Sequence, residues 1–145
     1  GLILNKKNKN MSERLHAIFG FAVDVYEGGP VENDKIFFIS KGKKITENFS
    51  EISEEFYLTE DIESVVTGMI EEQISVDEIK VFSGYSGWAS KQLESEVRRK
   101  MWTVVEVYNL DYTLPNDESL WKSIMQNLGG EFLLWAHAPE DVSMN

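Results

Sequence analysis

The chain has 145 residues, with 25 acidic and 14 basic side chains and a formal net charge of −11. This length predicts one domain with a substantial core, and no apolar run reaches the roughly 18 residues of a transmembrane helix. The sequence contains no cysteine, which excludes a disulfide framework, a thiolate metal site and a cysteine nucleophile and fits a cytoplasmic protein.

The negative charge argues against binding of nucleic acid or anionic membranes, because such proteins need a positive face to neutralise phosphates. Two short basic stretches, Lys6–Lys9 and Lys41–Lys44, stand against this trend. We interpret both as solvated loops. Only their convergence on one face of the fold would favour direct DNA binding.

The first third of the chain predicts a strand, a helix and a turn. Gly1–Asn5 is apolar and β-prone, and Ser12 is placed to cap a helix that ends near Gly20. Apolar and polar residues alternate loosely over Phe21–Tyr26, which leads into the turn Gly28-Gly29-Pro30.

The middle of the chain predicts two strands and the clearest amphipathic helix. Lys35–Ser40 and Phe56–Leu58 are compact β-prone runs. Thr59 is placed to cap the helix that follows. Its apolar positions fall at i, i+3, i+4, i+7 and i+8 and are Ile62, Val65, Val66, Met69 and Ile70.

The remaining pattern predicts a strand at Ile79–Gly84, a helix at Ser90–Met101 and a strand at Trp102–Tyr108. On the outer face of that helix, Glu94 is expected to pair with Arg98 and Glu96 with Lys100. Asn116 or Asp117 is expected to cap a last helix that Gly129–Gly130 ends, with Phe132–Ala136 extended after it. Strands and helices alternate without βαβ regularity, which predicts a single α+β domain with a mixed sheet and three to four flanking helices.

Two glycine-punctuated segments are the most informative feature of the sequence. The first is Glu27-Gly28-Gly29-Pro30-Val31, and the second runs from Ser83 through Gly84-Tyr85-Ser86-Gly87-Trp88 to Gln92-Leu93-Glu94. Both are predicted to lie where a strand passes into another element, since glycine permits positive φ and proline fixes φ at a negative value suited to turns. In this order and spacing they resemble the paired signature of the YqgE/AlgH family of bacterial proteins.

The resemblance extends over nearly the whole chain and includes Gly1-Leu2-Ile3-Leu4-Asn5-Lys6, where Lys7 replaces the family's usual proline, as well as Trp102 and Leu120-Trp121. It implies the family's α+β fold over residues 1–145, without roughly two strands that family members carry before the position of Gly1. It implies at most a regulatory role, and no established activity or cofactor.

The candidate ligand-binding residues lie at the two glycine segments: Gly28, Gly29, Pro30, Gly84, Tyr85, Ser86, Gly87, Trp88 and Gln92. Tyr85 and Trp88 can form an aromatic platform beside a helix N-terminus, which can hold an anion. Alternatively, Trp88 packs under the following helix. The glycine pair can approach a phosphate, or it can form a tight turn packed against the Gly84 junction.

Ser86 stands between a strand and a helix, like the serine of a nucleophile elbow, but Trp88 occupies the place of the second glycine in that motif. Such a hydrolase would also need His16 or His137 beside Ser86. Two histidines are too few for a histidine-rich metal site. The acidic runs Glu51–Glu55 and Glu60–Glu63 lack the spacing of a calcium loop.

The sequence therefore predicts a cytoplasmic binding or regulatory module with no catalytic residues, no metal and no cofactor, whose partner is a protein or a small molecule. The alternative is an enzyme that uses a cleft between the Gly28–Pro30 turn and the Gly84–Trp88 junction, with Ser86 or Glu94 in a chemical role. Contacts of Ser86 with a histidine or a buried acid would favour the enzyme.

Overall fold

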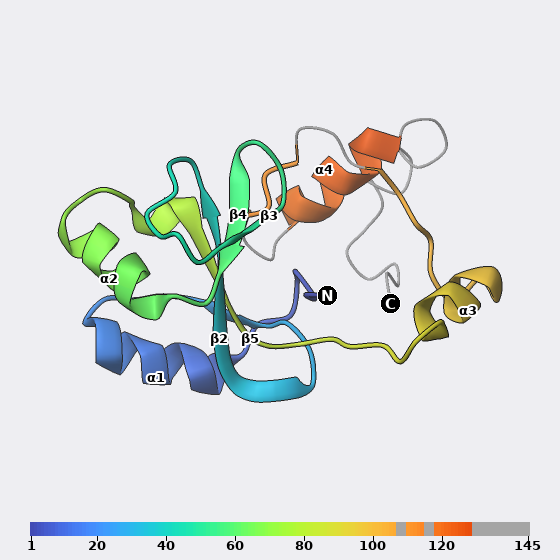
Figure 1. Ribbon diagram of the computed structural model, residues 1–145, viewed down its shortest axis with the longest axis horizontal. Coiled ribbons are helices and arrows are strands. Elements are labelled where there is room, and N and C mark those ends of the chain that lie inside the picture. Colours follow the sequence, from blue (N-terminus) through green and yellow to red (C-terminus); the bar gives the residue numbers. More distant parts are fainter. Residues whose placement is uncertain (107–109, 115–117, 129–145) are drawn as a thin grey trace. The chain divides into compact units, whose positions relative to one another are not determined.

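The computed structural model describes residues 1–106, 110–114 and 118–128, and Figure 1 shows its ribbon. The chain divides into two compact units, Gly1–Gly87 and Trp88–Asn145. The elements of the first unit are α1 (Lys9–Phe19), β1 (Val25–Glu27), β2 (Val31–Lys41), β3 (Ser50–Glu51), β4 (Phe56–Thr59), α2 (Ile62–Ile70), the 3-10 helix η1 (Val76–Glu78) and β5 (Ile79–Tyr85). The second unit contains α3 (Gln92–Arg98) and α4 (Glu118–Leu128).

The first unit is built on a five-stranded mixed sheet with the strand order β1-β5-β2-β4-β3. β1 runs parallel to β5, and Glu27 at its end lies opposite Ser83. The pairs β2 with β5, β2 with β4 and β3 with β4 are antiparallel. This combination of a mixed sheet with helices confirms the predicted α+β fold class.

The hydrophobic core of the first unit lies between one face of the sheet and the helices α1 and α2. Alternate strand residues point to this face, and the two helices bury their apolar stripes against them. The buried cluster contains Met11 and Leu15 of α1, Val65 of α2, and Val25, Phe38, Ile79 and Val81 of the strands.

The opposite face of the sheet carries the intervening strand residues. Tyr26, Ile39 and Phe82 on this face are buried, and so is Lys80. The Lys80 ammonium lies 4.2 Å from the centroid of the Tyr26 ring. Such a cation–π contact offsets part of the cost of burying a charge.

Residues Gly1–Asn5 form no strand, contrary to the sequence prediction. They still make sheet-like hydrogen bonds, since the nitrogen and the carbonyl of Gly1 bond to the carbonyl and the amide of Ser86, both at 2.8 Å. The Ile3 amide donates to the Gly28 carbonyl at 2.9 Å. These contacts are too irregular in register to make a continuous ladder.

Helix α1 begins earlier than the sequence predicts, because Asn8 rather than Ser12 caps it. The Asn8 Oδ1 accepts a hydrogen bond from the Met11 amide at 3.0 Å, which satisfies a first-turn donor. The Ser12 hydroxyl has another role: it donates to the Asn8 carbonyl and accepts from the Val25 amide, both at 2.8 Å. Ser12 therefore ties α1 to β1.

Helix α2 is capped by Asp61, and not by Thr59 as the sequence predicts. The Asp61 carboxylate accepts hydrogen bonds from the Ser64 amide at 3.2 Å and from the Thr46 hydroxyl at 2.6 Å. Thr59 is buried at the end of β4, where its hydroxyl donates to the Asn48 carbonyl at 2.6 Å. Strand pairing thus removes Thr59 from the helix terminus.

In the second unit, α3 is shorter than the predicted helix Ser90–Met101, and residues 102–106 form no strand. In α4 and the segment before it, Leu110, Leu120 and Met125 are buried. The predicted caps Asn116 and Asp117, the helix end at Gly129–Gly130 and the extended segment Phe132–Ala136 lie outside the described residues.

Candidate functional site

The structure brings the Gly28-Gly29-Pro30 turn and the Gly84 junction together at the ends of β1 and β5. The two strands are parallel neighbours, so the segments that follow them leave the sheet side by side. The Gly28 amide donates to the Ser83 carbonyl at 2.9 Å, and the Ser86 hydroxyl donates to the Gly28 carbonyl at 3.2 Å. Five candidate residues (Gly28, Gly29, Gly84, Tyr85 and Ser86) therefore belong to one contact region.

Within this region the glycines let two backbones touch. A Cβ on Gly28 would collide with the Gly84 carbonyl oxygen, and a Cβ on Gly29 would collide with the Tyr85 backbone. Gly84 has φ +70°, and its Cβ would lie 2.5 Å from the Gly29 oxygen. The three glycines are buried, so the space between the two segments is filled by backbone.

The exposed edge of the contact region is formed by polar and aromatic side chains. The Asn33 amide nitrogen, assigned from its surroundings, donates to the Pro30 carbonyl at 2.9 Å and to the Gly29 carbonyl at 3.2 Å. Half-buried Tyr85 packs edge-on against Phe37, with ring centroids 5.9 Å apart. This edge can offer a ring and a hydroxyl to a ligand.

A lysine lies next to the same edge. The Lys35 ammonium is 5.5 Å from the Phe37 ring centroid and 3.3 Å from a carboxylate oxygen of Glu60. The hydrogen bond and negative charge of Glu60 are the main reasons that the pKa of Lys35 is raised above its ordinary value. Lys35 thus stays protonated and already has an anionic partner.

Ser86 is bound to backbone groups. Its hydroxyl donates to the Gly28 carbonyl, and its amide donates to the Gly1 carbonyl at 2.8 Å. Within residues 1–106, 110–114 and 118–128, no histidine or carboxylate makes a hydrogen bond to Ser86. His16 is exposed on α1, and His137 lies outside the described residues.

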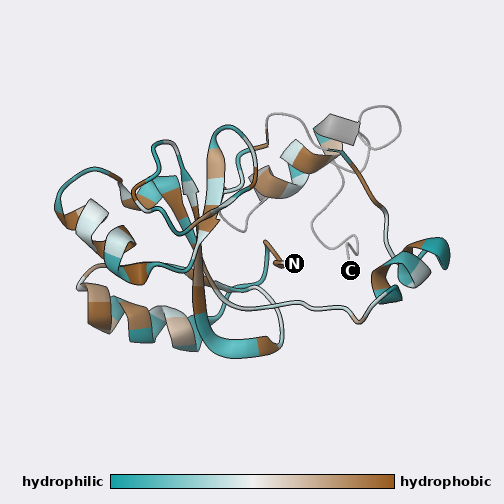
Figure 2. Ribbon diagram, in the orientation of Figure 1, coloured by the Kyte–Doolittle hydropathy of each residue, from teal (hydrophilic) through white to brown (hydrophobic). Residues whose placement is uncertain are grey.

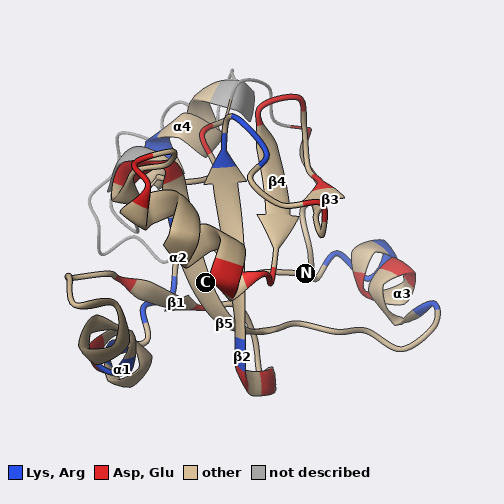
Figure 3. Cartoon of the chain, turned by 60° about the vertical axis from the view of Figure 1, so that its left-hand side comes forward, with Lys and Arg blue, Asp and Glu red and all other residues tan. Residues whose placement is uncertain are grey.

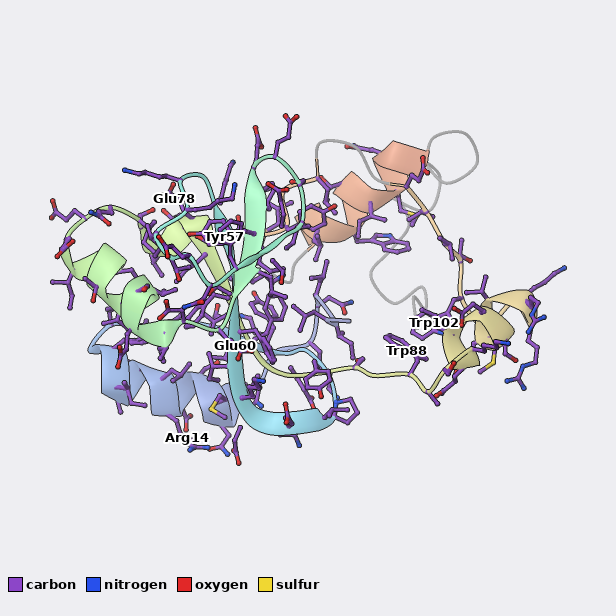
Figure 4. All side chains as sticks on the ribbon, viewed as in Figure 1. Arg14, Tyr57, Glu60, Glu78, Trp88 and Trp102 are labelled. Atoms are coloured by element: carbon purple, nitrogen blue, oxygen red, sulfur yellow. The ribbon has the colours of Figure 1, made fainter. Side chains whose placement is uncertain are left out.

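Trp88 and Gln92 belong to the second unit, where they form a cluster with two residues that the sequence analysis did not assign to the site. We call Trp88, Gln92, Glu96 and Trp102 the indole–carboxylate cluster (Figure 4). Both indole N–H groups donate to the Glu96 Oε2, at 3.2 Å from Trp88 and 2.7 Å from Trp102. The Gln92 Nε2 donates to the Glu96 Oε1 at 3.0 Å.

The cluster joins the segments before and after α3. The two indole rings meet edge-to-face, with centroids 6.2 Å apart and an interplanar angle of 74°. The Gln92 Oε1 also accepts from the Ala89 amide at 2.9 Å, which holds the segment before the helix. Trp88 is half-buried and Trp102 is 51% exposed, so solvent reaches the cluster.

Glu96 carries an ionised carboxylate at the centre of this cluster. The hydrogen bond from Trp102 and then that from Gln92 are the largest causes of its lowered pKa. All three side-chain donors are neutral, and the positive charge of Arg99 makes a smaller contribution in the same direction. The arrangement is a fixed anion beside two aromatic rings.

Glu96 therefore does not serve as the partner of Lys100 that the sequence analysis predicts. The available signal was the Gln92 to Glu96 spacing, since residues four apart share a helix face. The contribution of Trp102 could not be inferred from helical spacing, because Trp102 lies beyond the end of α3.

The described residues contain no group of three or more histidine, cysteine, aspartate or glutamate side chains that could hold a metal ion. In the same residues, no helix has both the length and the apolar composition needed to cross a membrane.

Comparisons with known proteins agree on one family. The family model described as AlgH-like matches residues 1–133. A UPF0301 protein of Cytophaga hutchinsonii is 29% identical over the whole chain and 81% of its own length, and one of Parabacteroides distasonis is 28% identical over the whole chain and 75% of its length.

Solved structures support the same assignment at the level of the fold. The AlgH protein of Pseudomonas aeruginosa matches with a TM-score of 0.69 and 21% identity, over 96% of this chain and 77% of that one. A protein of Corynebacterium diphtheriae matches with a TM-score of 0.65 and 17% identity, over 95% and 75%. The match to the family model, which spans most of the chain, confirms the resemblance drawn from the glycine segments: the protein belongs to the AlgH-like family.

Proposed function

We propose that this protein is a non-catalytic binding module, and that its indole–carboxylate cluster recognises a cationic group of its partner. The observation that carries this proposal is the Glu96 carboxylate, which accepts hydrogen bonds from both Trp88 and Trp102. Of the candidate residues, Trp88 and Gln92 would carry the recognition. The Gly28, Gly29 and Gly84 contacts would hold the fold.

A cation is the ligand that such a cluster favours. Tryptophan is the best of the aromatic side chains for cation–π contacts, which contribute about 0.5–2 kcal/mol. A nearby carboxylate adds an electrostatic attraction, which solvent weakens at an exposed site. Both contributions have the same sign, and the groups that hydrogen-bond to Glu96 are neutral.

A binding module with a regulatory role in the cytoplasm fits the remaining features. The chain has no cysteine and therefore no disulfide, and a fold that needs no disulfide suits a reducing compartment. We do not favour DNA as the partner, because Lys6 pairs with Glu27 at 2.9 Å and Lys7 with Asp24 at 3.3 Å. The basic segments of the first unit are also separated from one another (Figure 3).

The alternative, an enzyme that uses the glycine segments, is less well supported. It needs an activated nucleophile, whereas the Ser86 hydroxyl donates to the backbone of Gly28. One further expectation stays a proposal: that both units fold as one domain.

The proposal is tested by tryptophan fluorescence during titration with tetramethylammonium, arginine amide and a short lysine-rich peptide. Quenching by all three indicates recognition of the cationic group itself, and quenching by the peptide alone indicates a protein partner. We expect Glu96→Gln, which keeps the shape but loses the charge, to weaken binding about tenfold. Trp88→Phe should remove most of the signal.

Glu54→Gln is the matched control, because Glu54 is exposed and the substitution removes the same charge from another surface. It should change the affinity less than twofold. Equal weakening by Glu54→Gln and Glu96→Gln would mean that the cations respond only to net charge. Absence of quenching by every probe would contradict the proposal.

A further inference from the structure

A second feature, in the first unit, is an open apolar groove between α1, α2 and η1. It has a volume of about 760 Å³, which is within the range of ligand sites. Figure 2 shows the hydrophobic segments of both helices. We define the apolar groove by five of the residues that line it, Ile18, Phe21, Val66, Ile70 and Val76.

The groove exposes side chains that a folded protein normally buries. Ile70 is 77% exposed, Ile18 is 70% exposed and Val76 is 42% exposed. Single exposed apolar residues are common, but a contiguous apolar hollow marks a site of interaction. The three residues come from three different elements, so the exposure is a property of the assembled fold.

Acidic residues border this groove. Among the residues that the structure describes, the charged ones that line it are Glu72 and Glu78, with no lysine or arginine. Glu78 also accepts a hydrogen bond from the Ser75 amide at 3.0 Å, which fixes its carboxylate at the groove. Any occupant must therefore match an apolar floor and a negative edge.

The segment from Ile70 to Glu72 is also unfavourable for stability. Glu71 and Glu72 place two negative charges at the C-terminal end of α2, where the helix dipole favours cations. Glu72 has φ +59°, a left-handed conformation that is unfavourable for a non-glycine residue. Proteins keep such unfavourable charges and backbone conformations mainly in segments that serve a function.

We propose that the apolar groove docks an amphipathic helix of a partner protein whose apolar face is flanked by lysine or arginine. Such helices insert residues at i, i+3, i+4 and i+7 into grooves of this kind. The flanking cations would meet Glu72 and Glu78 and compensate for the acidic end of α2. This site is independent of the indole–carboxylate cluster.

Other occupants fit less well. A second copy of this chain docked groove to groove would place Glu72 near its own symmetry mate, which like charges disfavour. A neutral apolar molecule would fill the floor but would leave the acidic edge without a role.

The test measures fluorescence anisotropy of a labelled synthetic helix with leucine at positions i, i+3, i+4 and i+7 and lysine at the positions that flank this apolar face. A helix of leucine and glutamate in the same pattern is the probe control. We expect Ile70→Asp to weaken binding of the leucine–lysine helix about tenfold, and Glu72→Lys to weaken it and reduce its salt dependence. Ile70 is largely exposed, so the variant should fold.

Matched variants separate docking from net charge. Val104→Asp introduces the same acid at an apolar residue that is 73% exposed in the second unit, and Glu54→Lys makes the same charge reversal elsewhere. Both should change the affinity less than twofold. In amide NMR spectra the peptide should shift residues 18–22 and 66–78.

Four results would overturn the proposal. The first is equal weakening by Ile70→Asp and Val104→Asp, and the second is equal binding of the leucine–glutamate helix. The third is peptide-induced shifts confined to other residues. The fourth is a dimer in sedimentation that Ile70→Asp converts to a monomer, which would identify a second copy as the occupant.

Discussion

The contact between the two glycine segments can be tested by adding a single methyl group. Gly84→Ala places a Cβ 2.5 Å from the Gly29 oxygen and 3.0 Å from the Val31 oxygen, at a residue with φ +70°. Both neighbouring atoms are backbone, so no side-chain rotation can relieve the contact. The variant therefore combines a conformational cost with a steric cost.

The two costs can be estimated separately. A left-handed conformation costs a non-glycine residue about 1–2 kcal/mol, and overpacking costs about 1–3 kcal/mol. We expect Gly84→Ala to lower the free energy of unfolding by about 2–5 kcal/mol. For a chain of this size that corresponds to a fall in Tm of roughly 5–15 °C.

Other glycines of the chain isolate each cost. Gly20 has φ +77° with nothing within 4 Å of an added Cβ, so Gly20→Ala should show the conformational cost alone. Gly28→Ala should show the steric cost alone, because only its contacts with Gly84 and Leu2 are too close. Gly87→Ala meets atoms no closer than 3.9 Å and should be nearly neutral.

The assay is urea unfolding followed by far-UV circular dichroism, with the free energy of unfolding extrapolated to water. The expected order of destabilisation is Gly84→Ala first, then Gly28→Ala and Gly20→Ala, then Gly87→Ala. If Gly84→Ala lowers the free energy of unfolding by no more than Gly20→Ala does, the two backbones do not approach each other as closely as described.

Two further predictions concern the helix termini. Ser12→Ala should lower the free energy of unfolding by about 1–3 kcal/mol, because it leaves the buried Val25 amide without its acceptor. Urea unfolding measures this loss. A loss below about 0.5 kcal/mol, which is typical of an ordinary surface substitution, would contradict the prediction. The pKa of Asp61 is lowered in the folded protein, mainly by the hydrogen bonds from Thr46 and then Ser64. Asp61 therefore contributes stability above its unfolded pKa of about 3.9, and this contribution disappears as pH falls through the lower folded pKa. Urea midpoints of the wild type and Asp61→Asn should differ at neutral pH and converge in acid, and a constant difference would refute the assignment.

The fold class and the main elements could be predicted from the sequence because their patterns are local. The compact β-prone run Lys35–Ser40 predicts a strand from its residue types, and the helical period of α2 reflects burial of one face. The residues that cap the helices could not be predicted as well as the helices themselves. Asn8, Asn10 and Ser12 are all chemically able to cap α1, and the choice depends on the Val25 amide, which needs the Ser12 hydroxyl.

In the candidate site, too, the sequence predicted some features and missed contacts that depend on the folded structure. Spacing and family resemblance led to the Gly28 and Gly84 segments, and the structure places those two segments in contact. Glu96 was instead interpreted as one half of a surface ion pair. Its actual donors include Trp88 and Trp102, which lie outside α3 on either side. A periodic pattern describes one helix and cannot reveal residues that reach it from its flanks.

The apolar stripe of α2 illustrates what periodicity leaves open. Its five apolar positions predict one face, yet Val65 is fully buried while Ile70 is 77% exposed. Met69 in the last turn still packs against the core, whereas its neighbour Ile70 lines the apolar groove and stays exposed. A stripe that served only to bury α2 would gain nothing from Ile70, because an exposed isoleucine contributes no burial energy. The same segment also carries acids against the helix dipole. Both features become favourable when an apolar surface with positive charge covers them, so the sequence of α2 is explained by its core and a partner together.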